Sequence, residues 1–154
     1  MSAVLRFRWQ RLDTVPPAVW PVGTSLLPLA SVDPQALHAI LVEAYAAGFG
    51  EVSDFDDWWH TLTIDPEFDP DLLLVAGTVQ GAPIGLIQCW TSAFIKDLAV
   101  RPDWRGKGIA SALLLTAFRR FYARGARHVD LKVMANNAAA IALYRRLGMV
   151  PAPL

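Results

Sequence analysis

One stretch in the middle of the chain, residues 97–124, most limits the folds open to it. An apolar run ends at Val100, a loop containing Pro102 follows, and Gly106-Lys107-Gly108 then leads into a run of apolar residues at helical spacing. These apolar residues are Ile109, Leu113, Leu114, Ala117, Phe118 and Phe121, and Gly125 follows them. The pattern predicts a strand, a tight loop and a long amphipathic helix in direct succession.

Similar patterns predict the remaining elements. Strands are expected at residues 4–9, 25–29, 72–76, 84–91, 94–100 and 129–133, and helices at about 34–45, 53–62 and 137–147. Asp33 and Ser53 are suited to cap the first two helices, and Asp65-Pro66 and Asp69-Pro70 mark a loop. Because the connections among the central strands are short, we expect antiparallel neighbours in a mixed α/β sheet with helices on both faces.

The length of the chain is sufficient for one domain, and its composition limits which partners and which cellular location we expect. The 154 residues include 14 basic and 14 acidic side chains, so no general attraction to nucleic acid is expected. The single cysteine, Cys89, excludes an internal disulfide and a multi-cysteine zinc site, so no metal is expected. The first residues lack a secretory signal, which favours a cytoplasmic protein. Residues 72–95 carry no charge, but their glycines and Pro83 favour a strand hairpin over a membrane span.

The glycine-rich loop has the properties of an anion site. Gly106 and Gly108 remove side chains where main-chain amides can approach a ligand, and a helix N-terminus favours negative charge. Arg105 and Lys107 add positive charge, and a diphosphate suits the site, although a glycine-assisted helix start is the alternative. A dinucleotide fingerprint, with Asp130 about 20 residues further on, fits less well because five residues separate the strand from the glycines.

Two motifs resemble the GNAT superfamily of acyl-CoA-dependent N-acetyltransferases. The first is Leu98-Ala99-Val100-x-Pro102-x-x-Arg105-Gly106-x-Gly108-Ile109-Ala110, similar to that family's pyrophosphate loop. The second is Leu131-x-Val133-x-x-x-Asn137, followed by Ala139, Ile141, Leu143-Tyr144 and Leu147-Gly148-Met149, similar to its last strand and helix. The resemblance covers residues 25–150, and the Asp65–Pro70 run is similar to mycothiol-synthase-type members. It implies a GNAT-like domain at 25–154, a mostly antiparallel sheet with a splayed parallel pair, and an extension at 1–24.

The resemblance also implies acetyl-CoA as acyl donor and a role for each motif residue. Main-chain groups of Leu98, Ala99 and Val100 would pair with pantetheine, and Asn137 would hydrogen-bond to it. Arg105 and the amides of Gly106, Lys107, Gly108, Ile109, Ala110 and Ser111 would hold the pyrophosphate. Tyr144 would protonate the departing thiolate, and the Val100 N–H would polarise the thioester carbonyl. From the residues alone, Asn137 could equally be a helix cap and Tyr144 a packing residue.

Two departures from the family pattern, at Lys132 and after the last helix, limit this assignment. Lys132 stands where many relatives have a glutamate base, so Asp97, Asp130 or a water chain must take the proton. The acceptor pocket is expected around the first two helices, where acidic and aromatic residues suit a cationic amine: Glu51, Asp54, Asp56, Asp57, Trp58, Trp59 and His60. Only residues 149–154 follow the last helix, so the C-terminal hairpin is shortened, and residues 4–9 or another protomer, in a homodimer, would cover strand 129–133.

The sequence therefore predicts an N-acetyltransferase acting on a primary amine of a small molecule, a protein N-terminus or a lysine. Transfer would proceed by direct attack, with Tyr144 and Asp97 as the catalytic candidates. The alternative is a non-catalytic acyl-CoA-binding or interaction module of the same fold, favoured by the absent glutamate and the short C-terminus.

Overall fold

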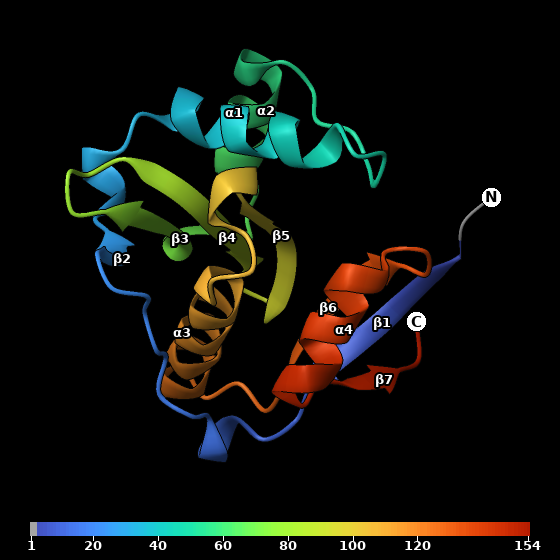
Figure 1. Ribbon diagram of the computed structural model, residues 1–154. Helices are drawn as coiled ribbons and strands as arrows, with labels where there is room; N and C mark the ends of the chain where they lie inside the picture. The colour runs from blue at the N-terminus through green and yellow to red at the C-terminus, as the bar shows by residue number, and fades with distance from the viewer. Residues whose placement is uncertain (1–2) are drawn as a thin grey trace.

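A seven-stranded sheet with helices on both faces organises residues 3–154, which the computed structural model describes (Figure 1). The strands are β1 (Val4–Trp9), β2 (Thr24–Leu27), β3 (Phe68–Thr78), β4 (Pro83–Trp90), β5 (Phe94–Val100), β6 (Val129–Met134) and β7 (Val150–Ala152). The helices are α1 (Pro34–Tyr45), α2 (Phe55–Thr63), α3 (Ile109–Ala123) and α4 (Ala138–Leu147), with short 3-10 turns at Leu12–Thr14, Leu29–Ser31 and Pro102–Trp104.

The sheet has the order β2-β3-β4-β5-β6-β1-β7 and a single parallel pair, β5 and β6. That pair is joined only at Phe94 with Asp130 and Ile95 with Leu131. The later residues of both strands have no partner across this junction, whereas β5 stays paired with β4 up to Val100. The expected splayed parallel pair is therefore present, and it leaves one main-chain edge of β5 available to a ligand.

The N-terminal strand β1 lies inside the sheet, between β6 and β7. It pairs antiparallel with all of β6, from Val4 opposite Met134 to Trp9 opposite Val129, and with the short β7 on its other side. The apolar strand expected to need a cover is thus paired within the same chain, by the segment Val4–Trp9. Only one short strand follows α4, which agrees with the shortened C-terminal hairpin.

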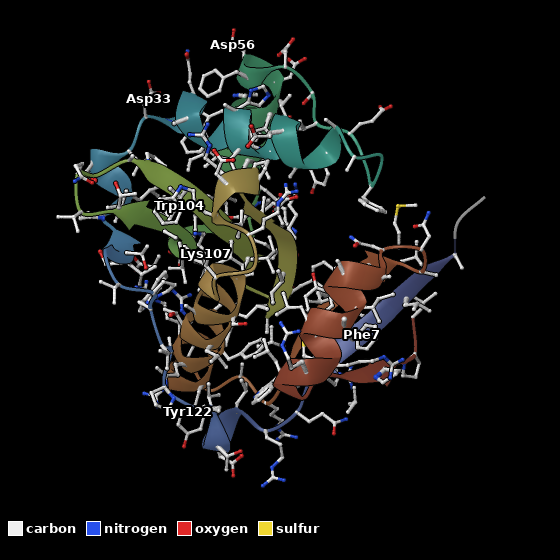
Figure 2. All side chains as sticks on the ribbon, viewed as in Figure 1. Phe7, Asp33, Asp56, Trp104, Lys107 and Tyr122 are labelled. Atoms are coloured by element: carbon white, nitrogen blue, oxygen red, sulfur yellow. The ribbon has the colours of Figure 1, made fainter. Side chains whose placement is uncertain are left out.

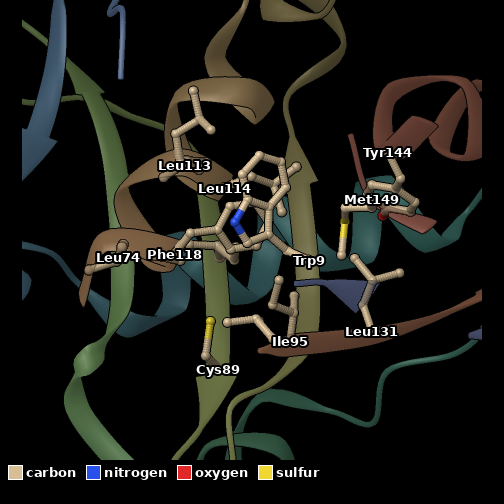
Figure 3. Close-up of a cluster of buried hydrophobic side chains, with 14 of the residues drawn as sticks. Trp9, Leu74, Cys89, Ile95, Leu113, Leu114, Phe118, Leu131, Tyr144 and Met149 are labelled. Atoms are coloured by element: carbon tan, nitrogen blue, oxygen red, sulfur yellow. The ribbon is translucent and has the colours of Figure 1, made fainter. Parts of the chain in front are cut away.

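Two buried clusters hold the helices on the sheet. Helices α1 and α2 cover one face over β3 to β5, with Leu37, Leu41 and Trp58 among the buried side chains. Helices α3 and α4 cover the other face, where Trp9 stacks on Phe118 with ring centroids 4.9 Å apart (Figure 3). The apolar stripe predicted for 109–121 is the buried face of α3.

A bulge in β5 sets the direction of its side chains. Gln88 lies opposite Asp97 and Cys89 lies opposite Ile95, so Lys96 is an extra residue without a partner on β4. Ile95 therefore packs in the cluster under α3, while Asp97 two residues later turns toward α1 and bonds to Tyr45. Without the bulge, the two side chains would share one face.

The structure corrects two local expectations. Asp69-Pro70, expected in a loop, lies within β3, where pairing is interrupted between Phe68 and Leu73, because proline has no N–H to donate to a ladder. The cap of α2 is Asp54 rather than Ser53, and its carboxylate accepts from the Asp57 N–H at 3.0 Å. Residues 72–95 form the predicted hairpin of β3 and β4 and continue into β5. Among residues 3–154, no helix has the length and apolarity needed to cross a membrane.

Candidate active site

The loop before α3 presents main-chain N–H groups that no side chain caps. Gly106 and Gly108 have φ values of +73° and +95°, a region that residues with a Cβ rarely adopt. Gly108 precedes the helix, and no side chain bonds to the first turn, whereas Asp33, Asp54 and Asn137 cap α1, α2 and α4. The first N–H groups of α3 lack intrahelical partners and lie at the positive end of the helix dipole. These main-chain features are the ones that the predicted anion site requires.

The two basic residues of the loop are held differently. The Arg105 Nε donates to the Val100 carbonyl at 2.9 Å, which folds the loop back onto the end of β5. The Lys107 ammonium lies 5.8 Å from the centre of the Trp104 ring, and both residues sit at the start of α3 (Figure 2). Arg105 thus shapes the loop through one guanidinium nitrogen, and Lys107 carries an exposed charge beside it.

A cleft of about 610 Å³ opens between this loop and α4. Of the residues predicted to bind a cofactor, it is lined by Leu98, Val100, Arg105, Gly106, Gly108, Ile109, Ala110 and Ser111. Helix α4 contributes the opposite wall, with Ala139, Ala140, Leu143, Tyr144 and Arg146. Residues from two separate motifs therefore meet at one cleft, as the resemblance implies.

The three residues of β5 predicted to pair with pantetheine direct their main-chain groups to two different sides of the strand. The Arg101 N–H donates to the Ile84 carbonyl of β4, and main-chain groups alternate in direction along a strand. Ala99 therefore directs its main-chain groups toward β4, and its methyl group packs under α1. Leu98 and Val100 direct theirs toward the splay. The expectation for Ala99 is thus corrected, while Leu98 and Val100 remain placed to pair with a ligand.

A second cavity, of about 310 Å³, lies beside the cleft. Leu98 and Tyr144 line both spaces, so the two cavities adjoin at these side chains. Tyr144 is 7% exposed, and burial raises the pKa of its hydroxyl to about 12, so it stays protonated at neutral pH.

Asn137 also lines the second cavity. Its Oδ1 accepts from the Ala140 N–H at 3.3 Å, which makes Asn137 the cap of α4. Its NH₂ group makes no hydrogen bond in residues 3–154 and could donate to a ligand.

Asp97 belongs to a buried network beside a third cavity. The Tyr45 hydroxyl donates to its Oδ1, and the Lys96 ammonium lies 2.9 Å from its Oδ2. Burial first, and then the charge of Asp97, raise the pKa of Tyr45 far above its ordinary value. The third cavity, of about 230 Å³, is lined by Tyr45, Glu51, Trp58, Lys96 and Asp97, among others. Asp97 does not line the second cavity, but Tyr45 lines both.

Sequence reasoning missed the part that Tyr45 plays. Tyr45 falls at helical spacing with the apolar residues Leu37 and Leu41, a position that by itself indicates packing, and only the bulge at Lys96 brings Asp97 within reach of its hydroxyl. The available signal for this role was a tyrosine among apolar residues at the end of the helix, where its hydroxyl can reach a polar partner. The site therefore includes a phenol and a carboxylate that come from different elements.

The other candidate residues are less well placed. Asp130 forms ion pairs with Arg8 and Arg6 instead of facing the cleft. Of the acidic and aromatic residues expected to form the acceptor pocket, Glu51 and Trp58 line the third cavity. Asp54 caps α2, and Asp56 lies at the outer end of that helix, far from Lys107 (Figure 2).

Comparisons with known proteins agree with this geometry. The family model described as "Acetyltransferase (GNAT) family" matches residues 31–149. A mycothiol acetyltransferase from Clavibacter michiganensis is 36% identical over 135 residues, which are 82% of this chain and 42% of that protein. The crystal structure of a GCN5-related N-acetyltransferase from Sphaerobacter thermophilus superposes with a TM-score of 0.83 and 30% identity, covering 97% of this chain and 48% of that one.

The ribosomal-protein-S18-alanine N-acetyltransferase from Escherichia coli has a TM-score of 0.69 and 25% identity, over 84% of this chain and 79% of that chain. The first two relatives are about twice as long as the part that this chain matches. The family model covers both the glycine loop and the strand and helix that carry Asn137 and Tyr144. The chain belongs to the acetyltransferase (GNAT) family.

Proposed function

We propose that the chain is an N-acetyltransferase that moves the acetyl group of acetyl-CoA to a primary amine by direct attack. The observation that supports the proposal is the juxtaposition of two cavities. The uncapped start of α3 borders the cleft, and the cleft shares Leu98 and Tyr144 with a second cavity. In this arrangement an extended cofactor in the cleft and an acceptor in the second cavity would meet at the splay.

The chain's own groups account for cofactor binding in three places. The N–H groups from Gly106 to Ser111 would hold the pyrophosphate, favoured by the dipole of α3. Leu98 would pair with a pantetheine amide as an added strand does, and the Val100 N–H is left for the thioester carbonyl because the Val100 carbonyl accepts from Arg105. The Asn137 amide, which lines the second cavity, would donate to the same arm. The Arg105 bond to Val100 keeps the loop and the strand end in register for both contacts.

In the proposed reaction, the amine nitrogen attacks the thioester carbon, the C–N bond forms and the C–S bond breaks. The Val100 N–H, directed toward the splay, would stabilise the negative charge that develops on the carbonyl oxygen. Tyr144 would donate its proton to the departing thiolate. The nitrogen must lose a proton, and the Tyr45 hydroxyl, already bonded to Asp97, gives that proton a route to a carboxylate. The products are an amide and a free thiol.

Calorimetric titration with acetyl-CoA tests the cofactor site. Gly108→Trp would block the loop and abolish binding, while Gly81→Trp, at another left-handed glycine in the turn between β3 and β4, is the matched control for backbone strain. Binding that survives in the Gly108 variant, or fails in the wild type at millimolar ligand, would contradict the proposal.

Turnover with a panel of amines of small molecules, peptide N-termini and lysines then tests catalysis. A protein that binds acetyl-CoA and acetylates none of them is the non-catalytic acyl-CoA-binding module instead. Two observations favour this second candidate. Lys132 stands in place of a carboxylate, and Asp97 is already bonded to Tyr45 and Lys96.

A further inference from the structure

The cavity that faces the splay is basic and apolar. Among the residues that line it, Lys96 and Lys132 carry positive charges, and no aspartate or glutamate contributes to its wall. Its apolar wall consists of Val4, Phe49, Ile95, Leu98, Leu131, Val133 and Met134. This is the opposite of the acidic and aromatic acceptor pocket that the sequence of the first two helices predicts.

The two lysines differ in how far their charges are neutralised. Lys96 lies 2.9 Å from the carboxylate of Asp97, so its charge is already paired. Lys132 forms no ion pair within residues 3–154, and the neighbouring Asp130 is held by Arg6 and Arg8. Arg6, opposite Lys132 on β1, is paired with Asp130 and does not line the cavity. The cavity therefore faces one uncompensated cation at Lys132.

The acidic cavity beside Asp97 does not compete for the reacting amine. It is lined by Glu51, Asp65 and Asp97, but by neither Leu98 nor Tyr144, which line both the basic cavity and the cofactor cleft. Tyr45 and Lys96 line both the acidic cavity and the basic one. Under the proposed function, the basic cavity is therefore the one placed to hold the acceptor.

We infer that the acceptor is a small primary amine that carries a carboxylate and an apolar body, and that Lys132 binds the carboxylate. The inference rests on the proposed function. The volume of about 310 Å³ is at the lower end of the range for ligand pockets, which favours an amino acid or a similar small molecule. One ammonium point charge matches one carboxylate, while a phosphate group is more often met by several donors or an arginine fork.

Acetylation rates of paired amines test the inference. Leucine is compared with leucinamide, and 6-aminohexanoate with 6-aminohexanamide, in the wild type and in Lys132→Gln, so that differences in amine pKa cancel between proteins. We expect Lys132→Gln to lower kcat/KM for the carboxylates about tenfold, mainly through KM, and for the amides less than about twofold. Lys132→Glu should favour the amides, and Arg11→Gln, which removes an exposed charge elsewhere, should change neither rate.

Three results would overturn the inference. One is an equal loss for both members of each pair in Lys132→Gln. Another is a wild type that prefers the amides. The third is 6-aminohexyl phosphate exceeding 6-aminohexanoate about tenfold in a Lys132-dependent manner, which would assign the site to phosphate.

A binding measurement separates this inference from the proposed function. If no amine is acetylated, the proposed function fails, but titration of the same pairs into the CoA-bound protein still measures the preference of the cavity. Tighter binding of the carboxylates, lost in Lys132→Gln, supports the inference without turnover. Equal binding of acids and amides rejects it even if the protein acetylates amines.

Discussion

Arg8 on β1 holds the carboxylate of Asp130, its direct partner on β6, with two hydrogen bonds of 2.7 and 2.9 Å. Burial raises the pKa of Asp130, but the Arg8 bond and the charges of Arg8, His128 and Arg6 outweigh it and lower the pKa below the ordinary value of 3.8. A carboxylate with a lowered pKa in the folded state stabilises the fold above its ordinary pKa. That contribution is lost as the pH falls through the lowered pKa.

We therefore expect the free energy of unfolding to fall as the pH drops below about 4, with part of this slope due to Asp130. Asp130→Asn should be less stable than the wild type at pH 7 and should lose that part of the slope. Urea unfolding at a series of pH values measures both. Asp13→Asn, at an exposed carboxylate, is the control, and an unchanged slope in Asp130→Asn would show that the pairing contributes no pH-dependent stability.

The interior position of β1 makes its apolar side chains essential to the fold. Phe7 is 1% exposed and packs beside Tyr144 with ring centroids 6.1 Å apart. Phe7→Ala should lower the free energy of unfolding by about 3–5 kcal/mol, because it removes a large side chain and leaves a cavity. Leu5→Ala, on the same strand but 37% exposed, should cost less than about 1 kcal/mol. Chemical denaturation measures both.

Deleting residues 1–20 extends the same test, since it exposes the whole edge of β6. Unchanged stability of the deletion variant, or a Phe7→Ala cost similar to that of Leu5→Ala, would mean that β1 is dispensable to the sheet.

Local pattern explains why the strand, glycine loop and helix at 97–124 were predictable. Turn glycines and helical spacing depend on neighbours in the chain, and Gly106, Gly108 and the stripe of α3 lie where the sequence puts them. The residues that an anion site needs are also consecutive there. The sequence could thus predict which consecutive residues border the cleft before α3, although Ala99 and Lys107 do not line it and Asn137 lines the second cavity instead. Their roles in cofactor binding stay a prediction.

Contacts between distant segments explain what the sequence could not reveal. The bulge that turns Asp97 toward Tyr45 depends on the register of β5 against β4, which the apolar pattern of β5 does not encode. The basic cavity likewise arises because Lys96 and Lys132, from strands paired at only two positions, line one space. The acidic residues of α2 led us to expect a negatively charged pocket. In the structure Asp54 caps that helix, and Asp56 and Asp57 lie in its first turn.

Cys89 is buried on β4 under α3, and burial, followed by the charge of Asp97, raises the pKa of its thiol (Figure 3). The thiolate is the reactive form, so the native protein should react with a disulfide reagent at least about 100-fold more slowly than the urea-unfolded protein. Absorbance of the released thiol measures both rates. Fast labelling of the native chain would indicate that β4 is accessible to solvent.

Tyr144→Phe tests the proposed acid. We expect kcat to fall about 10- to 100-fold while the Kd of acetyl-CoA changes less than about twofold, because only the transition state uses the proton. Tyr122→Phe, at an exposed tyrosine of α3, is the control. Because the pKa of Tyr144 is about 12, its hydroxyl stays protonated as the pH rises to about 10. In that range kcat should therefore not fall through deprotonation of this acid. Equal kcat values in Tyr144→Phe and the wild type would reject the role.

Tyr45→Phe and Asp97→Asn test whether the buried network accepts the amine proton. Tyr45 lines the basic cavity and its hydroxyl donates to Asp97, so removing either group breaks the proposed proton route. Each variant should lower kcat/KM about tenfold at neutral pH, with the loss shrinking as rising pH deprotonates more of the free amine. The double variant should be no slower than either single one, since groups that act as a unit are not additive. A pH-independent loss, or losses that multiply in the double variant, would instead assign the pair a purely structural role in holding α1 on β5.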